Sequence, residues 1–284
     1  MHFLMLLIGL VCAWGVRDLG VSAPEVLIRG TLAGRWQKTL GFFLFSPLLL
    51  LMTAIAIVCM GPSGRMVGHW EGWFSYDLAI GFLTWAIASG MKLAWEGHQT
   101  IQQLRQNPAI AVQGKAARLL DTTALYSAQV GFWQPELVIS QGLLTRLDDD
   151  HLAAVLVHEY AHAHYHDTFW FFWLGWLRRL TCWLPGTEDL WQELLMLREL
   201  RADRYAAQQV DPLVLAEALL LVVSAPMMSS DWCAAFGWTG RDRLTERIDS
   251  LLADPIPQPQ PHSWSMVWLC LVLLPLATIP FHAP

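Results

Sequence analysis

Residues 158–162 read His-Glu-Tyr-Ala-His, which is the pattern H-E-x-x-H. On a helix, residues four apart project from the same face, so the imidazoles of His158 and His162 can reach one Zn²⁺ ion. Glu159 then lies beside the open coordination position of that ion. The chemistry that this arrangement predicts is metal-assisted hydrolysis of a peptide bond. Glu159 would take a proton from the attacking water and pass it to the leaving amine.

A downstream segment with the pattern of a helix offers the remaining ligand. Catalytic zinc takes three protein ligands and leaves the fourth position to water, and two histidines with one glutamate are a standard set. Glu199 is the natural third ligand, with Glu188 or Glu193 as alternatives. Asp203, one turn further on, could accept the N–H of a ligating histidine and fix its tautomer, or could pair with a nearby arginine. We therefore predict one zinc ion per chain, with three ligands: His158, His162 and Glu199.

The elements that would position these residues can be predicted from patterning. Asp148, Asp149 and Asp150 suit an N-cap and an acidic first turn, and they predict a helix from there to about His166. The downstream helix, which carries Glu199, is expected to end before Asp211-Pro212, because proline disfavours a helical residue before it. Four further elements are predicted: a turn with a polar strand or loop over 107–123, a strand over 137–140, and helices over 188–209 and 213–224.

The composition indicates a membrane protein. Of the 284 residues, 55% are hydrophobic and 15% charged, with a mean hydropathy of +0.37, which excludes an ordinary soluble domain and a disordered chain. The net charge of −6 leaves no basic face, so direct nucleic-acid binding is not expected. The 5 cysteines have no paired spacing, which favours neither a disulfide framework nor a thiolate metal site. Four apolar segments could span a bilayer: 1–16, 41–60, 73–93 and 263–281.

The distribution of basic residues predicts the orientation of these spans. The first loop, 17–40, carries Arg17, Arg29, Arg35 and Lys38, whereas the second, 61–72, carries only Arg65, and positive charge marks the cytoplasmic side. Both termini are therefore expected outside the cell (inner) membrane. The predicted architecture is mainly α and has three parts: three transmembrane helices over 1–93, a cytoplasmic α+β domain over 94–262 ending in a proline-rich tether, and a fourth transmembrane helix over 263–284.

One apolar stretch lies between the H-E-x-x-H pattern and Glu199. Phe169–Leu177 is too short to span, so we expect an interfacial helix that presses the active site toward the bilayer. The strand around Leu137–Ser140 could hold an extended substrate by β-augmentation. Candidates for a further oxyanion-stabilising residue are Arg201, Arg204 and Tyr205.

These residues and this topology resemble the BlaR/MecR-type integral-membrane metallopeptidases, the antirepressor family of gluzincins. The similarity covers most of the chain, and its strongest part is carried by four stretches: Phe132–Ser140 with Gly142-Leu-Leu144, the H-E-x-x-H helix with Asp167, Glu199-Leu-Arg-Ala-Asp203, and Arg243–Leu252. The resemblance implies a gluzincin-type zinc domain after three spans and before a fourth. It also implies zinc ligation by His158, His162 and Glu199, with Glu159 as the catalytic acid and base.

The sequence departs from this family in two respects. Ala202 stands where the family often has a cysteine, and Glu-x-x-Ala-Asp is more similar to the CAAX-prenyl-protease and HtpX-like membrane gluzincins. HtpX-like chains, however, place two spans between the H-E-x-x-H pattern and the glutamate. Antibiotic-sensing members carry a penicillin-binding sensor domain after span four, which this sequence does not include, so we expect no β-lactam sensing.

The sequence thus predicts a membrane-embedded zinc endopeptidase that acts on a cytoplasmic or membrane-protein substrate. The resemblance implies a DNA-binding repressor as substrate in a regulatory signalling pathway, which is a family-level analogy. One alternative is an HtpX-like or CAAX-protease-like enzyme of membrane-protein quality control or processing. An alternative of another class is a non-catalytic signal transducer or scaffold, against which Glu159 argues because a structural zinc site needs no base. The expected partners are the bilayer, a protein or peptide substrate and, as an open alternative, a second copy in a homodimer.

Overall fold

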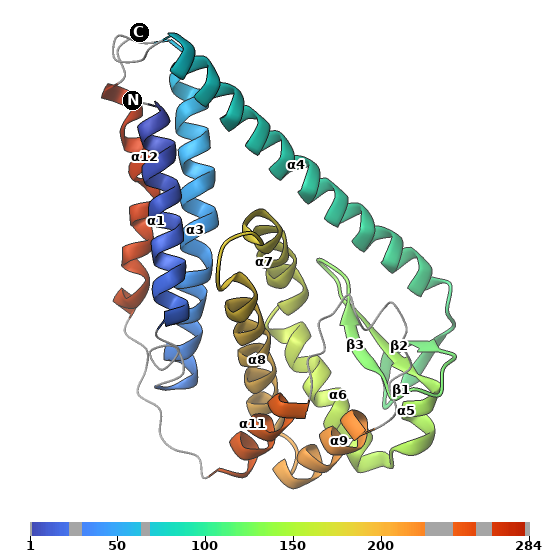
Figure 1. Cartoon of the computed structure of the whole chain (residues 1–284). Coiled ribbons are helices and arrows are strands. Elements are labelled where there is room, and N and C mark those ends of the chain that lie inside the picture. Colours follow the sequence, from blue (N-terminus) through green and yellow to red (C-terminus); the bar gives the residue numbers. More distant parts are fainter. Residues whose placement is uncertain (1, 23–29, 64–68, 225–240, 254–262, 282–284) are drawn as a thin grey trace. The chain divides into compact units, whose positions relative to one another are not determined.

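The computed structural model describes residues 2–22, 30–63, 69–224, 241–253 and 263–281 (Figure 1). Within this part the chain is mostly helical and contains a small four-stranded sheet. The chain divides into two compact units: Met1–Ala94 with Leu174–Leu195 and Gln258–Pro284, and Trp95–Trp173 with Met196–Pro257. The tether predicted over 254–262 lies outside the described residues, and the predicted domain boundaries stay predictions.

Three helices are long and apolar enough to cross a membrane: α1 (His2–Ser22), α3 (Leu32–Met60) and α4 (His69–Arg105). The hydroxyl of Thr31 caps α3 by accepting a hydrogen bond from the backbone N–H of Gly34, 3.1 Å away. In Figure 1, α1 and the C-terminal apolar segment run along α3, with which both are in contact. These helices support the prediction of membrane association, and they overlap the first three predicted spans.

The C-terminal apolar segment is built differently from these three helices. It consists of the 3-10 helix η1 (Ser263–Leu273), the short helix α12 (Leu274–Ala277) and η2 (Ile279–Phe281). Its apolar helical part, Val267–Phe281, is shorter than the roughly 20 residues that a transmembrane helix requires. A fourth span, and with it the external C-terminus, therefore stays a prediction.

The first predicted loop is shorter than expected because both flanking helices continue into it. Arg17 lies within α1 and is fully buried. Its guanidinium donates to the backbone oxygen of Phe43 at 2.9 Å, to Ser46 Oγ at 3.3 Å and to Thr181 Oγ1 at 3.4 Å. Neutral oxygens of neighbouring helices, rather than water in a loop, therefore solvate this charge.

The sheet belongs to the second unit and has the strand order β1-β2-β4-β3. Its strands are β1 (Ala109–Val112), β2 (Lys115–Leu120), β3 (Ser127–Val130) and β4 (Glu136–Ser140). β1 and β2 form an antiparallel hairpin around Gln113 and Gly114, whose φ angles of 47° and 79° suit a two-residue type I′ turn.

Strand β4 occupies the centre of this sheet. It pairs in parallel with β2 and antiparallel with β3. The prediction that the strand at 137–140 offers its edge to a substrate is therefore wrong, because both sides of β4 are already paired. Among the described strands, β3 is the edge strand next to β4.

Helices pack on the sheet to form the core of the second unit. They are α5 (Gln141–Arg146), α6 (Asp149–His164) and α9 (Pro212–Ser224), and the further helix α11 (Arg241–Leu252) packs on α9. Ile139 of β4, Leu143 of α5 and Val155 of α6 share one apolar cluster with Ala218 of α9. The predicted start of α6 is confirmed, because Asp148 Oδ1 accepts from the backbone N–H of His151 at 2.9 Å.

We predict that Gly142→Ala destabilises the second unit. A Cβ at this buried position would lie 2.2 Å from the backbone oxygen of Thr123, so the backbone must shift. Overpacking of this kind costs about 1–3 kcal/mol, measurable as a lower melting temperature in detergent. Gly97→Ala is the matched control, because it is exposed in α4 with open space around it and should gain stability from helix propensity. Equal melting temperatures for the two variants would contradict the prediction.

Candidate metal centre

Helix α6 directs two imidazoles to one point. His158 and His162 lie four residues apart on this helix, and their Nε2 atoms are 3.2 Å from each other. Both rings are largely buried, and their planes are nearly perpendicular, at 86°. Two nitrogen atoms from separate rings thus converge on the same small volume.

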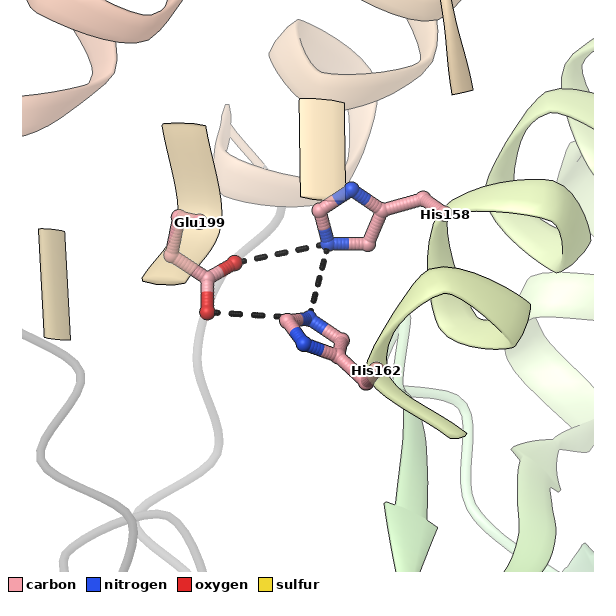
Figure 2. Close-up of side chains that lie close together, drawn as sticks. All are labelled: His158, His162 and Glu199. Carbon is pink, nitrogen blue, oxygen red and sulfur yellow. Dashed lines mark hydrogen bonds and ion pairs between the residues drawn. The ribbon is translucent and has the colours of Figure 1, made fainter. Parts of the chain in front are cut away.

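Helix α8 (Thr187–Ala206) brings Glu199 to the same point, as Figure 2 shows. Its Oε2 lies 3.4 Å from His158 Nε2, and its Oε1 lies 3.7 Å from His162 Nε2. The alternatives, Glu188 and Glu193, make other contacts: Glu188 pairs with Arg178, and Glu193 pairs with Arg35.

The spacing of these three groups fits a zinc ion. Tetrahedral zinc with bonds of about 2.0–2.1 Å holds its ligand atoms about 3.3 Å apart. Within the described residues, His158, His162 and Glu199 form the one group of histidines, cysteines and acids whose ligand atoms all lie within 4.8 Å of one another. Two imidazoles and a carboxylate are also a donor set of catalytic zinc, in which three protein ligands leave one position open.

A buried carboxylate orients His158. Asp203 lies one turn after Glu199 on α8, and its Oδ1 is 2.9 Å from His158 Nδ1. The same carboxylate accepts two hydrogen bonds of 2.7 Å from Arg247 of α11. Asp203 therefore pairs with Arg247 rather than with a neighbouring arginine on its own helix. Because Nδ1 faces Asp203, Nε2 of His158 is the ring atom left for a metal ion.

A tight reversal of the chain supplies the matching carboxylate for His162. Helix α6 ends at His164, and His166 has a left-handed backbone, with φ of 54°. Helix α7 (Asp167–Thr181) begins at the next residue, so Asp167 returns to the end of α6 and its Oδ2 lies 2.8 Å from His162 Nδ1. Asp167 also pairs with Arg201 of α8. Both histidines thus face a buried carboxylate with Nδ1.

The charged groups around the site shift one another's pKa values. Burial lowers the pKa of His158, but the contacts with Asp203 and Glu199 outweigh it and raise that pKa to about 9. Burial raises the pKa of Glu199, yet Arg198, which donates to Oε1 at 2.8 Å, and the neighbouring histidines hold it well below its usual range. Burial also opposes ionisation of Asp203, and Arg247 lowers its pKa nonetheless. Both carboxylates are therefore anionic at neutral pH.

Glu159 lies next to His158 on α6 and is also buried. Its Oε1 accepts a hydrogen bond of 2.8 Å from Ser127 Oγ at the start of the edge strand β3. The carboxylate is therefore held at the junction between the metal centre and the sheet edge. A base at this position suits the activation of water beside an ion.

Three residues at the site carry roles that the sequence reasoning did not assign. They are Asp167, which accepts from His162, Ser127, which donates to Glu159, and Arg247, which holds Asp203. Asp167 and Arg247 lie in stretches that carry the family resemblance, and this position in the sequence could have indicated a role at the site. Ser127 lies in a strand that the sequence analysis did not predict. Of the oxyanion candidates, Arg201 is engaged by Asp167 and by the ring of Tyr165, and Tyr205 stacks on His164 at 5.0 Å.

Comparison with known proteins points to the class of this site. The model of peptidase family M48 matches residues 98–186, a range that contains the H-E-x-x-H pattern and ends before Glu199. The match covers less than half of the chain, so it shows similarity to this metallopeptidase family, and it supports a hydrolase of the metalloprotease class. Together with the three apolar helices it indicates a membrane metalloprotease. A search of curated proteins finds no match to the chain.

We predict that zinc affinity rises with pH. Because the pKa of His158 is raised to about 9, the ion must displace a proton at neutral pH. This proton alone should make the apparent affinity increase about tenfold per pH unit between pH 6 and 8, and the increase should end above about pH 9. Competition with a chelator measures it. Asp203→Asn should flatten the dependence, whereas His164→Gln, a change of an exposed residue on the same helix, should not. A pH-independent affinity of the wild type would contradict the assignment.

Proposed function

We propose that this protein is a membrane-embedded zinc endopeptidase in which His158, His162 and Glu199 bind the metal and Glu159 is the catalytic acid and base. The observation that carries the proposal is the convergence of three ligand atoms within 4.8 Å beside a buried, hydrogen-bonded Glu159. A structural zinc site would use four protein ligands. The donor set of the described residues has three, which favours an enzyme over a non-catalytic scaffold.

The mechanism follows from what each side chain can do. A zinc ion bound by the three ligands supplies a Lewis acid that activates water and polarises the scissile carbonyl. Glu159 accepts the proton of the attacking water and returns it to the leaving nitrogen. Ser127 donates to one carboxylate oxygen of Glu159, which leaves the other oxygen to accept the proton of the reacting water. Asp203 and Asp167 keep the two imidazoles oriented throughout.

The edge strand β3 is the element best suited to hold the substrate. Its first residue, Ser127, contacts Glu159, and β4 occupies one side of the strand. An extended peptide that pairs with the other side would run directly past the base, with backbone hydrogen bonds that depend little on its sequence. This mode suits an endopeptidase that cuts within extended segments of proteins.

The physiological setting follows from the predicted topology and from the resemblance. With four spans and a cytoplasmic zinc domain, the substrate would be a cytoplasmic protein or the cytoplasmic part of a membrane protein. The resemblance to BlaR/MecR-type metallopeptidases favours a DNA-binding repressor as that substrate. Membrane-protein quality control or processing is the alternative, and the identity of the cleaved proteins separates the two.

Glu159→Gln tests the enzymatic assignment directly. The variant keeps the size of the side chain and all proposed ligands, so it should retain zinc while losing its base. Proteolysis should fall by about 10²–10⁴-fold. Zinc content of the purified protein and new protein N-termini in expressing cells are the two measurements. If wild type and variant generate the same N-termini, the proposed activity is wrong, and if neither holds zinc, the proposed site is wrong.

Ser127 should affect turnover rather than metal binding. Ser127→Ala removes a hydrogen bond to a charged group, worth about 1.5–3 kcal/mol, so kcat should fall roughly tenfold or more. Ser127→Thr keeps the hydroxyl and should restore most of the rate. KM and zinc content should change little in either variant. An alanine variant with the wild-type kcat would show that this hydrogen bond does not position the base.

A further inference from the structure

An aromatic surface projects from the second unit beside the edge strand. It combines two segments: the loop after β3, which carries Phe132 and Trp133, and the first half of α7. We call it the aromatic surface, and its residues are Phe132, Trp133, Phe169, Trp170, Phe172 and Trp173. The Phe132 ring lies 5.0 Å from Phe169 and 4.9 Å from Phe172, and Trp133 lies 4.9 Å from Phe169, measured between ring centroids.

The exposure of this surface is unusual for such large rings. Trp133 is 75% exposed, Trp170 58% and Trp173 43%. Gly131, with φ of 147°, permits the tight loop that presents Trp133, because a Cβ there would lie 2.9 Å from the backbone oxygen of Gln134. A contiguous exposed aromatic patch of this kind marks an interaction site for a membrane or for an apolar partner.

Two observations favour a lipid bilayer as the partner of the aromatic surface. The second half of α7 contacts a candidate span, because Trp176 Nε1 donates to the backbone oxygen of Ala86 in α4 at 2.8 Å. The first half of the same helix carries four rings of the aromatic surface. Its residues Phe169–Leu177 include no charged side chain, and tryptophan is the side chain best suited to the headgroup region of a bilayer.

We propose that the aromatic surface inserts into the headgroup and acyl boundary of the membrane and holds the edge strand β3 at the bilayer surface. The loop that carries Trp133 begins directly after Val130, the last residue of β3. Insertion of this loop places the strand parallel or close to the lipid surface. Peptide segments that emerge from the membrane would then meet β3 first, which makes juxtamembrane segments the favoured substrates. The membrane contact itself does not depend on proteolysis.

Site-directed spin labelling of the full chain in nanodiscs tests this proposal. In a background with all 5 cysteines changed to serine, Trp133→Cys and Trp170→Cys each carry one nitroxide. The nanodiscs contain phosphatidylcholine and phosphatidylglycerol. Both labels should be accessible to oxygen and protected from a water-soluble nickel chelate, at a depth of about 5–10 Å below the phosphate level. Asp150→Cys is the control, because it is exposed about 20 Å away along α6 and should give the opposite pattern.

The outcomes separate this proposal from the proposed function. Labels at 133 and 170 that both contact water would overturn the membrane contact, whether or not the protein is a protease. Labels that contact water and lose mobility on addition of an unfolded protein would also overturn it, and would indicate a peptide-binding surface instead. The same measurement in the Glu159→Gln variant should give unchanged depths. A melting temperature like that of the unlabelled background shows that the two single substitutions preserve the fold.

Discussion

The candidate metal centre depends on two close contacts, each between the Nδ1 of a histidine and a buried carboxylate. Asp203 faces His158 at 2.9 Å, and Asp167 faces His162 at 2.8 Å. A neutral imidazole carries one N–H, and placing it on Nδ1 leaves the lone pair of Nε2 for a metal. Without these carboxylates the rings could rotate or adopt the other tautomer, and three converging ligand atoms would no longer define a site.

Burying these carboxylates requires cations, and arginines from other parts of the chain supply them. Arg247 forms two hydrogen bonds with Asp203, and Arg201 pairs with Asp167. Removing one partner of such a buried pair commonly costs about 3–5 kcal/mol because the remaining charge is left uncompensated. Helix α11 therefore stabilises the orientation of His158 although it provides no ligand. This arrangement couples the folding of a distant segment to the geometry of the metal centre.

The parts of this structure that follow local rules could be predicted from the sequence. The spacing of His158 and His162 on a helix that begins after Asp148 predicts their common face. Capping residues and apolar periodicity predict α6, α8 and α9 within a few residues. The three long apolar helices could likewise be predicted, because length and hydropathy are properties of the sequence alone. Whether Glu199 ligates a metal stays a prediction, but its approach to both imidazoles agrees with it.

What could not be predicted depends on contacts between segments distant in sequence. Ser127 lies in a strand of four residues, Ser-Ala-Gln-Val, with too little alternation to be recognised. The order of the strands is set by long-range pairing, which places β4 between β2 and β3. For this reason the prediction that the strand at 137–140 pairs with a substrate is wrong. Arg247 acts across 44 residues of sequence, and no spacing rule connects it with Asp203.

The reversal at His166 has a mechanical consequence. Asp167 is the first residue of α7, and the aromatic rings Phe169, Trp170, Phe172 and Trp173 follow on the same rigid helix. A helix moves as a body, so a tilt imposed on those rings also displaces the carboxylate that faces His162. If the aromatic surface lies in lipid as proposed, a change in bilayer thickness that tilts α7 would therefore change the position of the carboxylate that orients His162.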